Sequence, residues 1–142
     1  MPEPRSSERS QFSRVRVLIV EDNRHFARIL KTMLRSYGIK DIFEAEDSFA
    51  ALEVLADQDI DLMITDLSIP GISGFELIHI VRSAGDLPNP SLPILVVSAS
   101  ADKASVLNAM KSGADDYAIK PISTATLGRK VKNLVGKTPI AA

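Results

Sequence analysis

The chain has 142 residues, a length that suits one domain with one full hydrophobic core. Its 45% hydrophobic and 25% charged residues are ordinary for a soluble globular protein, and a net charge of −1 favours neither nucleic acid nor an anionic membrane. Because the chain has no cysteine, disulfides and thiolate metal sites are excluded, which is compatible with a cytoplasmic location. No apolar run approaches the ~20 residues of a membrane helix, and the polar N-terminus lacks the apolar core of a signal peptide. We expect residues 1–13 to be a disordered tail.

After this tail, five apolar runs predict five strands. The runs are VRVLIV (15–20), DIFEAE (41–46), LMIT (62–65), ILVV (94–97) and DDYAI (115–119). Continuous apolar stretches at 17–20, 62–65 and 94–97 are typical of strands that helices cover on both faces. Polar residues interrupt the other two runs, which favours edge strands. Residues 83–93 form a long loop that is rich in turn formers.

Amphipathic segments between these runs predict helices. The segment from Phe26 to Tyr37 has helical spacing, with Asn23 as its N-cap and Gly38 as its end. Ser73 and Glu76 can form a capping box before the next helix, and further helical patterns precede Gly113 and end at Val135. Alternating strands and helices indicate an α/β fold, with one open parallel sheet and helices on both faces.

Polar residues follow four of the five predicted strands. They are Glu21, Asp22, Asp66, Ser98 and Lys120, and Pro121 follows the lysine. The carboxyl ends of parallel strands share one edge of the sheet, which is where open α/β sheets bind ligands. Three acids, a hydroxyl and an ammonium group are therefore expected to converge there.

Three neighbouring carboxylates repel one another unless a cation lies among them. The expected ligands are all oxygen atoms, a set that selects Mg²⁺, with Mn²⁺ as a substitute. Protein-bound Mg²⁺ usually completes its shell with phosphate oxygens, which the Lys120 ammonium and the Ser98 hydroxyl are suited to bind. This pattern predicts a phosphoryl-transfer site with Asp66 as a carboxylate nucleophile.

Four motifs in this order resemble the response regulator receiver domain of two-component signalling. They are VLIVEDN (17–23), MITDLSIPGISGFEL (63–77), ILVVSAS (94–100) and DDYAIKP (115–121). The resemblance covers residues 14–136 and leaves 137–142 as a C-terminal tail. It implies a flavodoxin-like (CheY-like) five-stranded parallel sheet in the order 2-1-3-4-5.

The resemblance also implies roles for the residues at this edge. Asp66 would accept a phosphoryl group from the phosphohistidine of a sensor histidine kinase or a histidine phosphotransfer protein. Asp22 and Asp66 would ligate Mg²⁺ directly, Glu21 would act through water, and the Ser68 backbone carbonyl would add a ligand.

Other implied roles concern how the phosphoryl group is held and read. Lys120 would pair with it, Ser98 and Tyr117 would form a switch pair, and a cis peptide bond would precede Pro121. The family often has Thr at the position of Ser98; Ser keeps the hydroxyl and lacks the methyl group.

Two other functions are alternatives to a receiver domain. A phosphatase or phosphotransferase that uses an aspartyl phosphate would need a cap domain or a second acid just after Asp66, where Leu67 and Ser68 stand. A flavin-binding module would need a hydroxyl- and glycine-rich loop where Glu21 and Asp22 stand. We therefore expect a signalling domain, not an enzyme.

The expected receiver would act through a downstream protein or a fused output domain outside this chain, without direct contact with nucleic acid or a membrane. The first predicted helix carries a row of basic residues, which are Arg24, Arg28, Lys31 and Arg35. We expect this row to be a solvent-exposed helix face, and a docking site for the kinase is the alternative. His25 and His79 are expected to be ordinary helix residues.

Overall fold

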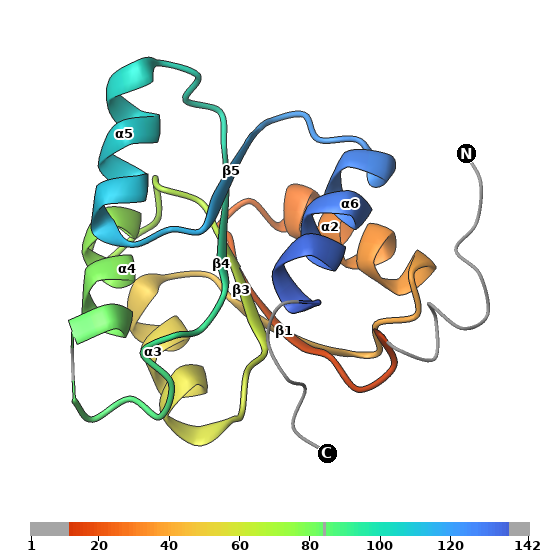
Figure 1. Cartoon of the computed structure of the whole chain (residues 1–142), viewed down its shortest axis with the longest axis horizontal. Coiled ribbons are helices and arrows are strands. Elements are labelled where there is room, and N and C mark those ends of the chain that lie inside the picture. The colour runs from red at the N-terminus through yellow and green to blue at the C-terminus, as the bar shows by residue number, and fades with distance from the viewer. Residues whose placement is uncertain (1–11, 84, 137–142) are drawn as a thin grey trace.

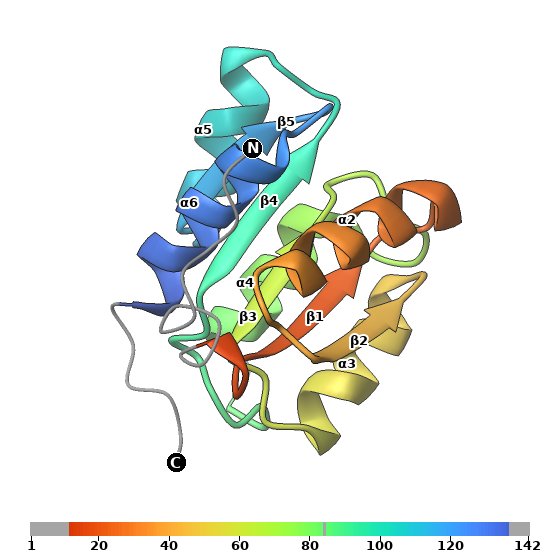
Figure 2. The same ribbon diagram turned by 90° about the vertical axis from the view of Figure 1, so that its right-hand side faces the viewer.

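The computed structural model describes residues 12–83 and 85–136, which form one five-stranded parallel sheet. The strands are β1 (Arg16–Val20), β2 (Asp41–Ala45), β3 (Leu62–Thr65), β4 (Ile94–Ser98) and β5 (Asp116–Ile119). Their order across the sheet is β2-β1-β3-β4-β5 (Figure 2), so the predicted fold and the predicted edge strands are confirmed.

Helices cover both faces of this sheet (Figure 1). They are α2 (Arg24–Ser36), α3 (Ser48–Asp57), α4 (Gly74–Ser83), α5 (Lys103–Ser112) and α6 (Thr124–Val135). α2 and α6 lie on one face, and α3, α4 and α5 lie on the other. None of the helices in the described ranges is long and apolar enough to cross a membrane.

The sheet separates two hydrophobic clusters because successive side chains of a strand point to opposite faces. In β1, Val17 and Ile19 face α2 and α6, while Leu18 and Val20 face α3 and α4. All residues of the central strands β3 and β4 are buried, as the continuous apolar runs predict.

Side-chain caps start the helices where the sequence signals indicate. The Asn23 side chain accepts a hydrogen bond from the Phe26 N–H (3.0 Å), which confirms the predicted N-cap. At the start of α4, Ser73 Oγ accepts from the Glu76 N–H at 3.2 Å, which is one half of the predicted capping box. Gly38 follows α2 with a φ of 92°, a left-handed conformation that suits glycine.

The predicted N-terminal tail is wrong at its inner end. Phe12 is only 2% exposed and lies in the same cluster as α2 and α6, with its ring edge-on to that of Tyr37 at a centroid distance of 6.4 Å. One aromatic residue within a polar stretch has no periodicity that would have predicted this contact. The remaining tail residues, 1–11 and 137–142, lie outside the described residues.

Tyr37 explains why a glycine lies inside α6. Its hydroxyl donates to the Thr124 carbonyl at 3.2 Å, and its ring passes directly over Gly128. A Cβ atom at position 128 would overlap this ring. Glycine lowers the helix propensity of α6, but it allows α6 to pack closely against Tyr37, which in turn contacts Phe12.

We predict that Gly128→Ala destabilises the protein although alanine is the better helix former. Overpacking costs about 1–3 kcal/mol and the gain in helix propensity is at most about 1, so we expect a loss of about 1–2 kcal/mol in the free energy of unfolding. Urea unfolding followed by circular dichroism measures it. Gly85→Ala is the matched control, since a Cβ there meets nothing within 4 Å. A stabilised Gly128→Ala protein would contradict this packing.

Candidate functional site

The register of the parallel strands determines which residues meet at the candidate site. Val20 of β1 lies beside Thr65 of β3, and the Asp66 N–H donates to the Val20 carbonyl at 3.1 Å, so Glu21 and Asp66 leave the sheet side by side. On the other side, the Lys120 N–H donates to the Ser98 carbonyl at 2.8 Å. The predicted convergence of these strand ends at one edge is thus present.

Lys120 joins two of the three predicted acids. Its Nζ atom lies 2.6 Å from Glu21 Oε1 and 2.7 Å from Asp66 Oδ2. Both carboxylates are almost fully buried, with side chains 3% and 8% exposed. The ammonium also lies over the ring of Phe26 in α2, 4.3 Å from its centroid. The edge of the sheet therefore holds a buried ion triad.

The triad changes the proton affinities of its members. Burial raises the pKa of Glu21 above its usual value, although hydrogen bonds from Lys120 and the Asn23 backbone oppose this rise. For Lys120, burial alone would lower the pKa, but the hydrogen bonds to Asp66 and Glu21 outweigh it and raise the pKa. Lys120 is therefore a permanent cation at neutral pH.

Asp66 lies at the carboxyl edge of the sheet, as the sequence predicts, but the residue is enclosed. The residue is 7% exposed, and both carboxylate oxygens have partners. Oδ2 binds Lys120, and Oδ1 accepts from the backbone N–H groups of Leu67 (2.6 Å) and Ser68 (3.2 Å). The Asp66 carboxylate is therefore fixed in position and ion-paired at the end of a central strand.

Asp22 differs from the other two acids. Its side chain is exposed and makes no hydrogen bond or ion pair with another of the described residues. Within the described ranges, no group of three or more acidic or histidine side chains is arranged to hold a metal ion. The free Asp22 carboxylate, the Asp66 carboxylate and the backbone carbonyls beyond it are nevertheless hard oxygen donors, the chemistry that Mg²⁺ selects.

Ser98 and Tyr117 are both linked to the loop after β4. Ser98 is 2% exposed, and its Oγ atom accepts from the Ser100 N–H at 3.2 Å. The Tyr117 hydroxyl donates to the Ser100 carbonyl at 2.6 Å, and the ring is half-buried beside the cluster of α3, α4 and α5. Ser100 therefore connects the two residues of the predicted switch pair. The bond before Pro121 is cis, as predicted.

Ser48, which the sequence did not single out, holds the loop after Asp66. Its buried hydroxyl accepts from the Ile72 N–H at 2.7 Å and donates to the Pro70 carbonyl at 3.2 Å. Gly71 has a φ of 92°, and a Cβ atom there would overlap the Ser48 hydroxyl. The signal in the sequence was a serine after the Asp47 N-cap, but no local pattern indicates a contact 22 residues away.

The basic row of α2 is mostly solvated. Arg24 pairs with Glu46 and Lys31 pairs with Glu44, in each case at 2.7 Å, while Arg28 and Arg35 are exposed. His25 and His79 are exposed helix residues, as predicted.

Comparison with known proteins establishes the family. The model of the response regulator receiver domain matches residues 17–132. Chemotaxis protein CheY-3 of Vibrio cholerae is 33% identical over 120 residues, which cover 84% of this chain and 91% of that protein. The chain therefore belongs to the response regulator receiver domains of two-component signalling.

Two solved structures have the same fold. The receiver domain of the Francisella response regulator 1452 has a TM-score of 0.80 and 29% identity, over 88% of this chain and 99% of that one. The receiver domain of the sensor histidine kinase PA1611 from Pseudomonas aeruginosa has a TM-score of 0.77 and 26% identity, over 86% and 98%. That protein has a magnesium ion coordinated in its active-site cleft.

The ion triad predicts a pH-dependent effect of removing the lysine. Lys120→Met leaves two buried carboxylates without their cation, so we expect a loss of about 3 kcal/mol in the free energy of unfolding at neutral pH. This deficit should shrink between pH 8 and pH 5. Burial raises the pKa of Glu21, and removing the lysine removes the contacts that oppose this rise. The folded variant then binds the Glu21 proton more tightly than the unfolded chain does, so protonation stabilises the fold at low pH.

Urea unfolding at several pH values, in EDTA, measures this effect. Lys103→Met is the matched control, because Lys103 is exposed at the start of α5 and should show a small deficit that does not depend on pH. A Lys120→Met deficit of equal size at pH 5 and pH 8 would show that the triad is not the cause.

Proposed function

We propose that this receiver domain is phosphorylated on Asp66 by a phosphohistidine donor, and that the phosphoryl group changes a surface for a protein partner. The main support is the Asp66 carboxylate itself, which backbone N–H groups orient at one oxygen and Lys120 neutralises at the other. The donor is a sensor histidine kinase or a histidine phosphotransfer protein. The reader is a downstream protein or a fused output domain.

The proposed transfer uses the groups at the sheet edge. An Asp66 oxygen attacks the phosphorus atom, a P–O bond forms, and the P–N bond to the donor histidine breaks. Lys120 then moves its hydrogen bond from the carboxylate to a phosphoryl oxygen, and Glu21 keeps the ammonium near the site. Because the lysine stays charged at neutral pH, it offsets the new negative charge without a proton transfer.

We further propose that Mg²⁺ is the cofactor, with Mn²⁺ as a substitute. Asp22, Asp66 and the Ser68 backbone carbonyl would hold the ion, and Glu21 would contact it through water. When bound, the ion supplies positive charge beside the carboxylates and the phosphoryl oxygens. Two observations support a Mg²⁺ site. The Asp22 carboxylate is exposed and makes no hydrogen bond or ion pair with another described residue, and the PA1611 receiver domain has a magnesium ion in its active-site cleft.

The proposed domain acts on itself and not on a separate substrate. A phosphatase or phosphotransferase is the alternative, but the residues after Asp66 are Leu67, which is buried, and Ser68, which is not an acid. The five helices pack on the sheet and leave no cap over this edge within the described residues. We place this activity in the cytoplasm, where histidine kinases present their phosphohistidine.

Asp66→Asn should abolish phosphorylation, because the amide is not a nucleophile. Incubation with acetyl phosphate and Mg²⁺, followed by intact-mass spectrometry, should show one phosphoryl group on the wild-type protein and none on the variant. Asp86→Asn, a matched change on an exposed loop, should behave as wild type. Asp22→Ala should raise the Mg²⁺ concentration needed for half-maximal phosphorylation by about tenfold or more. Equal phosphorylation of Asp66→Asn would overturn the proposal.

We propose that the phosphoryl group is read through Ser98 and Tyr117. A hydrogen bond from the Ser98 hydroxyl to a phosphoryl oxygen reorients this hydroxyl and weakens its bond to the Ser100 N–H. The loop after β4 then moves toward Asp66 and takes with it the Ser100 carbonyl that holds the Tyr117 hydroxyl. The surface of α5 and β5 changes shape without refolding.

Ser98→Ala should therefore accept the phosphoryl group and fail to pass the change on. Nucleophile, metal ligands and Lys120 are all intact in this variant, so we expect wild-type phosphorylation by mass spectrometry. NMR spectra with beryllofluoride should lose most of the shift changes at residues 99–119. Ser105→Ala, in the first turn of α5 where the serine hydroxyl bonds to Asp102, is the control and should keep them. A full wild-type shift pattern in Ser98→Ala would rule out this coupling.

A further inference from the structure

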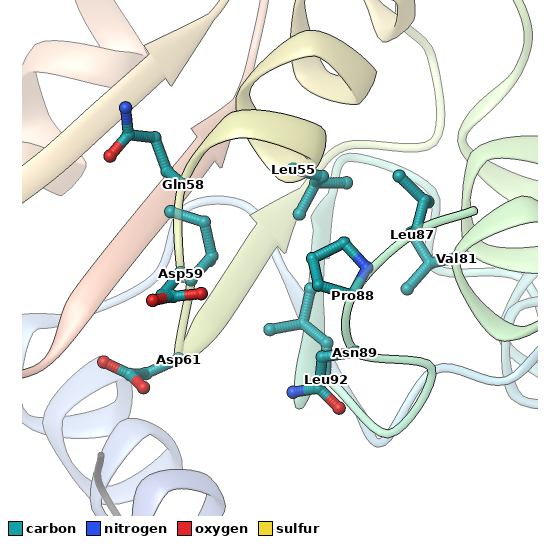
Figure 3. A pocket seen from close by; sticks show the side chains of 10 residues that line it. Leu55, Gln58, Asp59, Asp61, Val81, Leu87, Pro88, Asn89 and Leu92 are labelled. Carbon is teal, nitrogen blue, oxygen red and sulfur yellow. The ribbon is translucent and has the colours of Figure 1, made fainter. Parts of the chain in front are cut away.

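A cavity lies at the edge of the sheet opposite to Asp66. It has a volume of about 280 Å³ and lies between the segment that follows α3 and the loop that precedes β4. Its apolar floor includes Leu55, Val81, Leu87 and Leu92 (Figure 3). Asp59 and Asp61 stand on one side of the opening, and Asn89 stands on the other. The volume is near the lower end for sites that bind small molecules, roughly 300–1,000 Å³.

Both walls of this cavity are fixed by arginine residues. Arg82 of α4 donates from Nη1 to the carbonyls of Pro90 (2.9 Å) and Leu92 (2.6 Å), which holds the loop before β4. Arg16 of β1 donates to the Gln58 side chain (2.8 Å) and the Asp59 carbonyl (3.3 Å), which holds the opposite wall. The cavity is therefore preformed, so a ligand would not have to order its walls.

The electrostatic surroundings of the cavity favour a cation. In a parallel α/β fold the helices end where the strands begin, so the negative ends of the α3 and α4 dipoles both point toward this edge. α3 has no basic residue in its last turn and ends in Asp57, which is the unfavourable charge for that position. The Arg16 guanidinium is already engaged with the wall, and Arg82, the basic residue in the last turn of α4, is paired with Asp115.

Asp59 is the group best placed to contact a ligand. It lines the cavity and is exposed, and its carboxylate makes no hydrogen bond or ion pair with any other described residue. The neighbouring Asp61 carboxylate already accepts from the Arg16 backbone N–H at 2.8 Å. A free carboxylate at the mouth of an apolar cavity is complementary to an amine attached to a small apolar body.

We propose that this cavity binds a small organic cation, such as an arylalkylamine, with its apolar part against Leu55, Val81 and Leu92 and its ammonium beside Asp59. Such a site is separate from the phosphorylation site and does not depend on it. The ligand leaves its charge at the wet opening, where desolvation costs little, and buries only apolar surface.

NMR titration of the ¹⁵N-labelled full chain with phenethylammonium chloride tests the proposal. We expect saturable shifts confined to residues 55–61 and 81–92. The neutral 2-phenylethanol should bind more weakly, n-butylammonium should bind more weakly because it buries less apolar surface, and 3-phenylpropionate should not bind. Shifts elsewhere, no saturation with phenethylammonium, or equal binding of 3-phenylpropionate would overturn the proposal.

Three variants make the test specific. Asp59→Lys should weaken phenethylammonium binding by about tenfold, because an attraction becomes a repulsion at an exposed site. Glu53→Lys makes the same charge reversal on the exposed side of α3, away from the cavity lining, and should bind as wild type. Asp66→Asn should also bind as wild type, which separates this site from phosphorylation. Equal affinity in Asp59→Lys and Glu53→Lys would show that Asp59 takes no part.

Discussion

The Lys120 ammonium lies between two carboxylates that different strands bring to the same edge of the sheet. Glu21 follows β1, Asp66 follows β3 and Lys120 follows β5, so one cation connects three strand ends across the end of β4. Two buried carboxylates without this cation would be costly, and a buried lysine without them would be costly as well. The lysine thus offsets one of the two negative charges and leaves the site net negative, which suits the proposed Mg²⁺. In the proposed function, the same lysine also serves a phosphoryl group on Asp66.

The direction of the strands gives the two edges of the sheet opposite electrostatic characters. Helix N-termini lie at the edge that holds Asp66, where positive dipole ends favour a phosphoryl group. Helix C-termini lie at the other edge, beside the cavity with Asp59. The helix dipoles thus favour a phosphoryl group at one edge and the proposed organic cation at the other, and the acidic residues Asp57, Asp59 and Asp61 strengthen the second preference.

Much of the fold could be predicted because its signals are local. Apolar runs located the strands, and Asn23 and Gly38 located the ends of α2. The order of the strands came from the family resemblance, since no local pattern specifies which strands pair. The site residues were identified from strand ends and from that resemblance, and the repulsion among the acids predicts that Lys120 is drawn toward them. Which acids it pairs with, among them Glu21 across 99 positions, could not be derived.

Contacts made by single residues were the least predictable. Phe12 was assigned to the tail because its neighbours are polar, and only the three-dimensional packing against Tyr37 reveals its place in the core. Ser48 had no visible role for the same reason, and the 83–93 segment could be identified as a loop but not as the wall of a cavity.

The two loops beside Asp66 are held very differently, and this difference bears on the proposed response to phosphorylation. The loop after β3 is fixed by the Ser48 hydroxyl, and Gly74 packs so tightly on the Asp66 and Leu67 backbone that a Cβ atom would not fit. The loop after β4 is linked to Ser98 and Tyr117 by two hydroxyl groups, which can exchange partners at low cost. If charge is added at Asp66, the loop after β3 is held in place, whereas the loop after β4 is able to move. We therefore expect the proposed response to reach α5 and β5, where Leu107, Met110 and Ile119 are exposed apolar residues.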